Sequence, residues 1–516
     1  MSIKSGSSTG DASNSKTSTP NHATPIRGSA DEKQQDPEAN GEPQWDPAFE
    51  VSFSGDTDPR NPKSMSELRK WFIVIIVATT SLCVACTSSL YTGTYAQVEA
   101  EFGSRRVITT LGLSMFVVGL GLSPMVLAPL CEFYGRKPVY IASTFFFVVW
   151  IIPCAVAKNI TTLVIARFLD GFAGAAFLSV AGGTVGDLFT KSTLQAPMMV
   201  YTASPFLGPE LGPVIGNFIN YYVNWRWTFW VLLIWAGVQF LLVLFCVPET
   251  YSPVLLRKEA QKMRKETGDD RWHAPIEKMK RSVGGTILRS CYRPFMLLLL
   301  EPMVLLLCTF CAVVLGVLYL FFGAFNLVFT NNHNFNHWQV GLSFLGIMVG
   351  MVIGILSDPL WKKNYLRLLE NHKKRTGEAG SEPEYRLAPS IVGAPLVVIG
   401  LFWFGWTQYS FIHWMVPIVG SAFFGCGIIL VFSGIFTFLV ESYPLYAASA
   451  LAANSFARSM FAAMFPLFGP AMYNNLGYQW ATFLLTMICC VLAPFPYIFY
   501  KYGKRIRKRS RYVGAR

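Results

Sequence analysis

The sequence predicts an all-α integral membrane protein in which twelve transmembrane helices form two pseudo-symmetric halves of six. Two observations support this fold class. Of the 516 residues, 52% are hydrophobic and only 14% are charged, a composition far more apolar than a soluble enzyme needs. In addition, apolar runs long enough to cross a hydrocarbon core of about 30 Å recur along the chain from residue 71 onward.

The predicted spans fall into two groups of six, separated by a long polar segment. They cover residues 71–91, 107–129, 138–157, 161–188, 196–221, 227–247, 295–329, 340–360, 389–406, 415–440, 447–472 and 480–500. The segment before them is rich in Ser, Thr, Pro, Asp and Glu, so we expect residues 1–66 to be a disordered tail without a cleaved signal peptide. We divide the rest into a first half at 67–247, a linker at 248–293, a second half at 294–500 and a basic tail at 501–516.

The distribution of Lys and Arg predicts the orientation of the spans. One set of loops carries most of the cations, whereas the other has only Arg105, Arg106, Lys158 and Arg226 close to the spans. Because basic loops tend to stay in the cytoplasm, we expect a plasma-membrane protein with both termini cytoplasmic. Orientation then explains the formal charge of +13, and no basic stripe with stacking aromatics indicates nucleic-acid binding.

The sequence offers no pattern typical of an enzyme or of a metal or cofactor site. The two C-x-x-C pairs, Cys83/Cys86 and Cys308/Cys311, lie inside apolar runs, where packing explains them. There is no H-E-x-x-H sequence and no phosphate-binding G-x-x-x-x-G-K-[ST] loop. We therefore expect neither catalysis nor a cofactor, and an energy source other than direct ATP hydrolysis.

A weak internal repeat supports two related halves. Glu132 precedes Arg136 and Lys137 in the loop after span two, and Asp358 precedes basic residues at the same spacing after span eight. Parallel halves related by an axis normal to the membrane are a known transporter arrangement, with the substrate site at their interface.

The stretch from Ala128 to Lys137, which ends in Gly135-Arg136-Lys137, resembles the signature loop of the major facilitator superfamily. With the motifs below, it is similar to the twelve-span drug:proton antiporters of fungi. The resemblance implies a gating loop formed by Glu132, Gly135, Arg136 and Lys137 with Asp358. In physical terms, the acid of this loop can meet a helix N-terminus in the opposite half. Simple membrane orientation by Arg136 and Lys137 is compatible with the same pattern.

Arg167-Phe-Leu-Asp-Gly171 in span four is similar to the arginine motif R-x-x-x-G of this family. The resemblance implies that Arg167 takes part in proton coupling. A charge inside the bilayer is costly unless it is partnered, and residues three apart on a helix share one face. Asp170 is therefore either the neutralising partner of Arg167 or a proton carrier.

The sequence from Gly208 to Gly216 in span five resembles the antiporter motif that distinguishes exporters from uptake members. Its glycines and prolines are Gly208, Pro209, Gly212, Pro213 and Gly216. Glycines four residues apart allow close helix approach, and the prolines interrupt the backbone ladder. Packing alone could explain that pattern, but Glu210 inside it is expensive unless it faces a cavity or a partner. We place Glu210 in the transport pathway.

Several interior positions are candidates for the substrate cavity because aromatic walls with isolated polar groups suit flat, apolar or cationic cargo. They are Tyr91, Tyr319, Phe322, Asn326, Phe432, Phe436 and Arg458. Lipid-facing packing would explain many of these rings equally well. Arg458 lies near mid-membrane and needs a partner, for which Glu301 and Glu441 are the candidates. At the other membrane face, Trp225 and Trp227 suit an interfacial belt, with Arg226 snorkelling.

Leu256, Ala260 and Met263 recur at helical spacing among many cations in the linker. This pattern predicts either a helix on the inner membrane surface or a solvated connector.

Together these features predict a monomeric exporter of small organic compounds such as drugs, toxins or secondary metabolites. It would be driven by the proton gradient, work by alternating access and contact membrane lipids. A dedicated exporter of one metabolite, such as an organic acid or toxin, is the alternative. An importer or nutrient sensor is disfavoured by the span-five motif.

Overall fold

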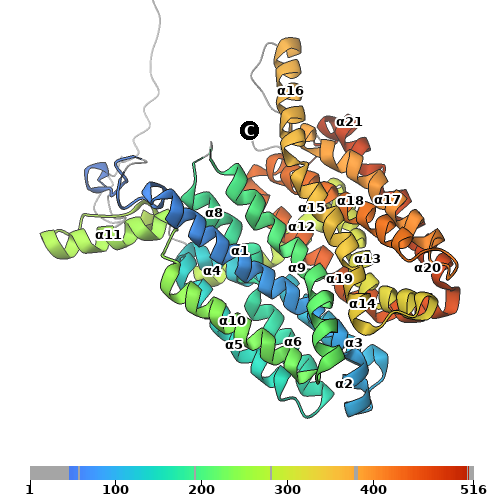
Figure 1. The fold of residues 1–516 in the computed structure, drawn as a ribbon. Coiled ribbons are helices and arrows are strands. Elements are labelled where there is room, and N and C mark those ends of the chain that lie inside the picture. The colour runs from blue at the N-terminus through green and yellow to red at the C-terminus, as the bar shows by residue number, and fades with distance from the viewer. Residues whose placement is uncertain are drawn as a thin grey trace, which may run out of the picture. The chain divides into compact units, whose positions relative to one another are not determined.

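The computed structural model describes residues 46–55, 58–190, 193–278, 282–376, 382–507 and residue 510. Residues 47–516 make up one unit by their mutual contacts. Its described residues are almost entirely helical, and the one β-bridge among them joins Glu50 to His273. Figure 1 shows the helices in chain order.

The helices of the first half run back and forth across the bundle. They are α1 (Glu67–Leu90), α2 (Tyr95–Phe102), α3 (Arg106–Leu122), α4 (Pro124–Tyr134), α5 (Arg136–Ala155), α6 (Ile160–Gly174), α7 (Ala176–Ser179), α8 (Ala181–Leu188), α9 (Gln195–Tyr222) and α10 (Arg226–Cys246). Predicted span two corresponds to α3 and α4, which meet at Ser123 before Pro124, and span four is divided into α6, α7 and α8.

The linker and second half continue the same pattern. Their helices are α11 (Ser252–Thr267), α12 (Val283–Leu300), α13 (Pro302–His333), α14 (His337–Ser343), α15 (Leu345–Leu356), α16 (Asp358–Thr376), α17 (Ala388–Trp406), α18 (Met415–Ser442), α19 (Ala447–Leu476), α20 (Tyr478–Leu492) and α21 (Phe495–Arg507). Nine stretches of the described chain are long and apolar enough to cross a membrane. The other three predicted spans lie in α6–α8, in α9 and in α19, which combine shorter helices or more polar and proline residues with the apolar ones.

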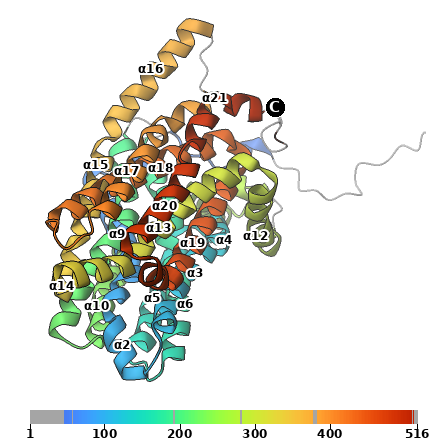
Figure 2. The ribbon, with the colours of Figure 1, turned by 90° about the vertical axis from the view of Figure 1, so that its right-hand side faces the viewer.

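The two halves pack side by side. In Figure 1 the first half is coloured from blue to green and the second half from yellow to red. Within the first half α1 packs on α9, and within the second α13 packs on α19. Contacts between the halves join α3 to α19, α9 to α14 and α15, and α4 to α12. Figure 2 shows α16 and α21 at one end of the bundle and α2 at the other. The end with α11, α16, α21 and the start of α5 carries most of the cations and is called the basic end below.

The start of predicted span seven differs from the structure. The helix does not run unbroken through residue 295: α12 ends at Leu300, and α13 begins at Pro302. Glu301, between them, has an extended backbone with φ −110° and ψ 99°, the region that the residue before a proline prefers. Helix α12 therefore crosses the predicted boundary at residues 293–294.

Part of the predicted tail also differs. Residues 1–45 lie outside the described residues, but residues 47–55, called the strap here, make specific contacts with the linker. Val51 donates its N–H to the His273 carbonyl at 2.9 Å, and His273 donates to the Phe49 carbonyl at 3.0 Å. Val51 also packs in a small core with Ala260 and Ala274.

This small core determines the place of the linker helix α11. Leu256 and Met263, two of the apolar residues for which the sequence left open a membrane-facing or a solvated helix, pack against the core of Val51 and Ala274. The apolar side of α11 is thus covered by protein, because strap and linker together supply enough apolar surface to bury it.

Candidate functional site

Arg167 and Asp170 form a buried ion pair on α6. The Arg167 Nη1 atom lies 3.5 Å from Asp170 Oδ2, and both side chains are 0% exposed. Arg167 Nη2 also donates to the carbonyls of Thr87 and Ser88 on α1, at 3.0 and 3.2 Å. The spacing of three residues on one helix face, predicted from the sequence, thus brings the two charges together, and Arg167 ties α6 to α1.

Aromatic rings surround the same guanidinium. Its central carbon lies 4.3 Å from the ring centre of Phe116 on α3 and 5.1 Å from that of Tyr91. Tyr91 is buried and donates its hydroxyl proton to the Thr109 carbonyl at 3.0 Å. Tyr91, a predicted cavity residue, therefore packs around Arg167 in this state, where cation–π contact and hydrogen bonds offset part of the cost of burial.

Glu210 lies in the middle of α9 and is 0% exposed. Neither of its carboxylate oxygens has a hydrogen-bond partner among the described residues. It also has no ion pair with them, in contrast to Asp170. A buried carboxylate in this position is costly when ionised, so the site favours the protonated form unless water or a cation enters.

The glycines of the antiporter motif explain how α9 holds Glu210 against α1. A methyl group at Gly208 would meet the Ala85 side chain, and one at Gly212 would overlap the Ser89 hydroxyl. At Gly216 it would meet the backbone of Leu90. The four-residue repeat thus forms a flat helix face on which α1 packs at close range.

Tyr319 connects the two halves near the centre of the molecule. Its hydroxyl lies 3.0 Å from Ser88 Oγ, so α13 in the second half is joined to α1 in the first. Tyr319 is 5% exposed and lies within electrostatic range of Glu210, Arg458 and Arg167. Tyr319 thus links the halves at a buried position near the middle of the molecule.

Arg458 is half-buried on α19 and packs against aromatic rings of α18. Its guanidinium carbon lies 4.8 Å from the Phe436 ring centre and 5.3 Å from that of Phe432. Phe432 in turn lies 5.4 Å from Phe206 of the first half, centre to centre. Three of the predicted cavity residues thus form one cluster at the interface between the halves.

Neither predicted acidic partner pairs with Arg458. Glu301 accepts hydrogen bonds from Tyr443 at 3.2 Å and from Ser510 at 2.7 Å. Glu441 accepts from Arg386 at 2.6 Å. Both acids lie near helix ends, where groups of the basic end reach them, and Arg458 has no ion pair with any described residue.

Phe322 and Asn326 lie further along α13 from the basic end than Tyr319. Phe322 is buried against Tyr319 and Phe344, with ring centres 5.1 and 5.6 Å away. Asn326 donates to the Phe322 carbonyl of its own helix at 2.9 Å. Of the two, only Phe322 has a ring contact with Tyr319.

At the predicted gating loop, the carboxylate that binds the backbone is Glu249. Its Oε1 accepts from the Arg136 N–H at 2.8 Å and its Oε2 from the Lys137 N–H at 3.2 Å, which caps the N-terminus of α5. Gly135 makes this possible, because its φ of +94° favours glycine and a side chain there would overlap Glu249. Glu132 is exposed on the surface.

Sequence reasoning assigned no role to Glu249. The sequence did contain a signal for this role. Glu249 directly follows span six, at the same end of the bundle as the helix start Gly135-Arg136-Lys137. The side chain of Arg136 completes the cluster, with its Nε 3.4 Å from Asp187 Oδ2.

Asp358, the equivalent acid of the second half, contacts the opposite half. Gln195, the first residue of α9, donates to Asp358 Oδ2 at 3.1 Å, and Lys362 donates to the Gln195 side-chain oxygen. The two repeats therefore differ: the second one joins the halves at the basic end, and the first one anchors its own half.

At the other end of the bundle, Trp225 is buried rather than placed in an interfacial belt. It is 1% exposed and donates its indole N–H to Glu101 at 2.7 Å, whereas Trp227 is 54% exposed. Arg226 pairs with the same Glu101 at 2.6 Å instead of snorkelling freely. Glu101, on the short helix α2, draws Trp225 inward.

Comparisons with known proteins agree with this architecture. The family model described as Major Facilitator Superfamily matches residues 77–466. The fold is also similar to that of the xylose transporter XylE from E. coli in a partially occluded inward-open conformation. The TM-score is 0.59 at 15% identity, over 84% of this chain and 98% of that one.

Curated relatives match nearly the whole chain. It is 64% identical over 475 residues to efflux pump atB of Aspergillus terreus, covering 92% of each protein. It is 39% identical over 471 residues to the probable drug/proton antiporter YHK8 of Saccharomyces cerevisiae, covering 90% of each. The multidrug transporter mdrA of Aspergillus fumigatus is 40% identical over 463 residues, 89% of this chain and 75% of that protein. The chain therefore belongs to the major facilitator superfamily and, within it, to the fungal drug-efflux transporters.

Proposed function

We propose that this exporter moves small organic compounds out of the cell in exchange for protons, and that Glu210 carries the proton. The observation that supports this assignment is a fully buried carboxylate without a hydrogen-bond or ion-pair partner among the described residues. Asp170 differs, because Arg167 already neutralises it. The name of the yeast relative, a probable drug/proton antiporter, is consistent with the proposal.

In the proposed cycle, cargo binds near Tyr319, Phe432, Phe436 and Arg458 while the cavity is open at the basic end. Outward opening releases the cargo and exposes Glu210 to external protons. Protonation removes the cost of returning a buried charge through the closed state, so the proton gradient drives the reset. Arg167 holds α6 against α1 throughout and sets the local field.

Transport in sealed vesicles tests the coupling. A panel of cationic, neutral and anionic compounds is loaded, and efflux is followed with an imposed proton gradient and after an ionophore collapses it. The proposal expects gradient-stimulated efflux of at least one class. Efflux that is unchanged by collapse of the gradient would contradict antiport.

We further propose a plasma-membrane location for a monomer whose basic end faces the cytoplasm. The positive-inside bias supports this orientation. Epitope tags at each terminus that are accessible only after the membrane is permeabilised would agree with it, and accessibility on intact cells would contradict it.

A second candidate is a dedicated exporter of one organic acid, which Arg458 favours. A guanidinium deep in a membrane protein needs a counter-charge, and Arg458 packs on two aromatic rings without an ion pair to any described carboxylate. A carboxylate on the cargo would complete the pair. Export confined to anions and abolished by Arg458→Gln favours this candidate, whereas retained export of cations by the variant favours the broad exporter.

A further inference from the structure

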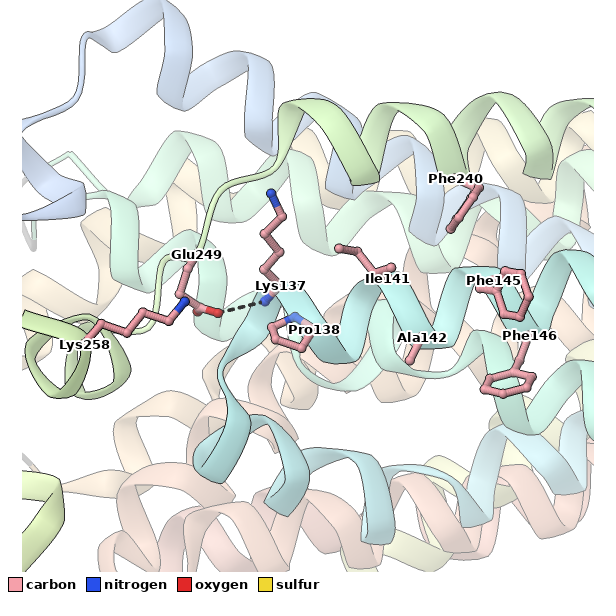
Figure 3. Close-up of a pocket in the computed structure, with 9 residues that line it drawn as sticks. All are labelled: Lys137, Pro138, Ile141, Ala142, Phe145, Phe146, Phe240, Glu249 and Lys258. Atoms are coloured by element: carbon pink, nitrogen blue, oxygen red, sulfur yellow. Dashed lines mark hydrogen bonds between the residues drawn. The ribbon is translucent and has the colours of Figure 1, made fainter. Parts of the chain in front are cut away.

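A groove at the basic end opens between α5 and α10 and has a volume of about 560 Å³. Its floor is apolar and comes from Ile141, Ala142, Phe145 and Phe146 of α5 with Phe240 of α10. Its mouth is polar and is formed by Lys137, Glu249 and, from the linker helix, Lys258. Figure 3 shows the lysines and Glu249 at one end and the phenylalanines at the other.

The apolar part of the groove lies on the outer surface of the helices. Phe145 and Phe146 are 48% and 51% exposed, and the ring centres of Phe145 and Phe240 are 6.1 Å apart. Leu241 and Phe245 of α10 are 52% and 77% exposed. In a protein that crosses a membrane, such a surface faces lipid chains.

The two lysines give the mouth of the groove a positive charge that Glu249 does not cancel. The Glu249 oxygens accept four backbone N–H groups, those of Arg136, Lys137, Thr250 and Tyr251, at 2.8 to 3.2 Å. Its negative charge is therefore balanced by the start of α5. The amines of Lys137 and Lys258 have no ion pair with a described residue, and so they remain available for an anion.

The position of α11 explains why Lys258 is at this site. The apolar side of α11, with Leu256, Ala260 and Met263, packs against Val51 and Ala274 and is therefore not the side that meets the membrane. Its exposed cations include Arg257 and Lys258. These cations, which suggested membrane contact, therefore favour contact of α11 with lipid headgroups and not insertion of the helix into the membrane.

We propose that this groove is a binding site for an anionic glycerophospholipid of the leaflet at the basic end. The phosphate group lies between Lys137 and Lys258, and an acyl chain lies along Ile141, Phe146 and Phe240. Two amines above an exposed apolar trough match the two chemical parts of such a lipid. The bound lipid would connect the transport helices α5 and α10 to the linker.

Native mass spectrometry of the delipidated full-length transporter tests this site. Phosphatidylserine and phosphatidylcholine with identical dioleoyl chains are added at equal concentrations. We expect one tightly retained phosphatidylserine and about tenfold weaker retention by Lys137→Gln/Lys258→Gln. The matched control, Lys158→Gln/Lys373→Gln, removes two exposed lysines elsewhere and should retain the lipid like the wild type.

Two further measurements distinguish a lipid site from a site for phosphate alone. Glycerophosphoserine, the headgroup without chains, should compete poorly. Phe146→Gln should weaken retention without unfolding the protein, because that side chain is half-exposed. Equal retention of both lipids, or equal loss in the control variant, would overturn the proposal. Strong competition by the chain-free headgroup would show a simple phosphate site and would overturn it as well.

Discussion

The Ser88 hydroxyl lies 3.0 Å from the Tyr319 hydroxyl, and this contact joins α1 of the first half to α13 of the second. Alternating access requires the halves to change their contacts, so a central bond of this kind contributes to the balance between conformations. The same tyrosine lies within electrostatic range of Glu210 and Arg458. The residue that joins the halves is therefore also close enough to interact with the unpaired groups Glu210 and Arg458.

Removal of that contact should have a modest and specific effect. Tyr319→Phe leaves Ser88 satisfied, because Ser88 also donates to the Ala85 carbonyl at 2.7 Å. We expect a coupling energy of about 1 kcal/mol between Ser88→Ala and Tyr319→Phe in a double-mutant cycle of unfolding in detergent. Thr80→Ala, which affects the same helix through Gln239, should show no coupling with Tyr319→Phe, and equal coupling in both cycles would refute a direct bond.

The close packing of α1 and α9 predicts a strong difference between two glycines. Gly212→Ala places a methyl group against Ser89, whereas Gly237→Ala on α10 meets nothing within 4 Å. We expect Gly212→Ala to lower the free energy of unfolding by about 1–3 kcal/mol. Gly237→Ala should leave it unchanged or raise it, because alanine favours helix.

Thermal unfolding of both variants in the same detergent provides the comparison. A Gly212→Ala protein as stable as Gly237→Ala would show that the two helices do not pack as described.

Glu249, not Glu132, should stabilise the start of α5. Glu249→Gln removes the charge that accepts the Arg136 and Lys137 N–H groups, and we expect a loss of about 1 kcal/mol. Glu132→Gln changes an exposed side chain and should alter stability by less than about 0.5 kcal/mol. The midpoint of unfolding measured by intrinsic fluorescence distinguishes the two, and a larger loss for Glu132→Gln would reverse the assignment.

The contact between strap and linker should resist mild acid. Lys278 donates to Glu50 at 2.5 Å and holds the pKa of that carboxyl below its ordinary value of 4.5. A carboxylate with a depressed folded pKa contributes stability above its unfolded pKa and loses it as pH falls through the folded value. The contact should therefore persist from neutral pH down to 4.5 and weaken only below it.

Hydrogen exchange at the Val51 and His273 amides, corrected for intrinsic rates, measures this contact. In the Glu50→Gln variant these amides should be less protected at neutral pH, and their protection should not fall further as the pH is lowered through the pKa of Glu50. Loss of protection in the wild type well above pH 4.5 would contradict the role of Glu50.

Sequence reasoning predicted the helical membrane fold well because apolar runs, charge bias and short motifs are local signals. The Arg167–Asp170 pair was also predictable, since two residues three apart on one helix lie on the same face. The Ser88–Tyr319 bond and the cap by Glu249 depend on helices far apart in the chain, which no local pattern specifies. The break at Glu301 could have been read from Pro302, but the continuous apolar run concealed it.

The acidic partner expected for Arg458 shows a different limit. The position of a residue along a membrane-spanning helix predicts that a charged side chain near mid-membrane needs a stabilising partner. It does not predict which group is that partner. Phe432 and Phe436, one turn apart on α18, provide two ring faces that the sequence could equally have placed toward lipid. The strap was missed because Phe49, Val51 and Phe53 are too few apolar residues, within a polar stretch, to predict a core of their own.

Proton coupling through Glu210 is tested most directly by gradient-driven efflux from two sets of vesicles. One set contains the wild-type protein and the other contains an equal amount of the Glu210→Gln protein. Cargo binding, measured separately, should be retained by the variant. The account predicts that an imposed proton gradient accelerates efflux by the wild type and leaves the variant at its gradient-free rate. A Glu210→Gln protein that responds to the gradient as the wild type does would contradict it.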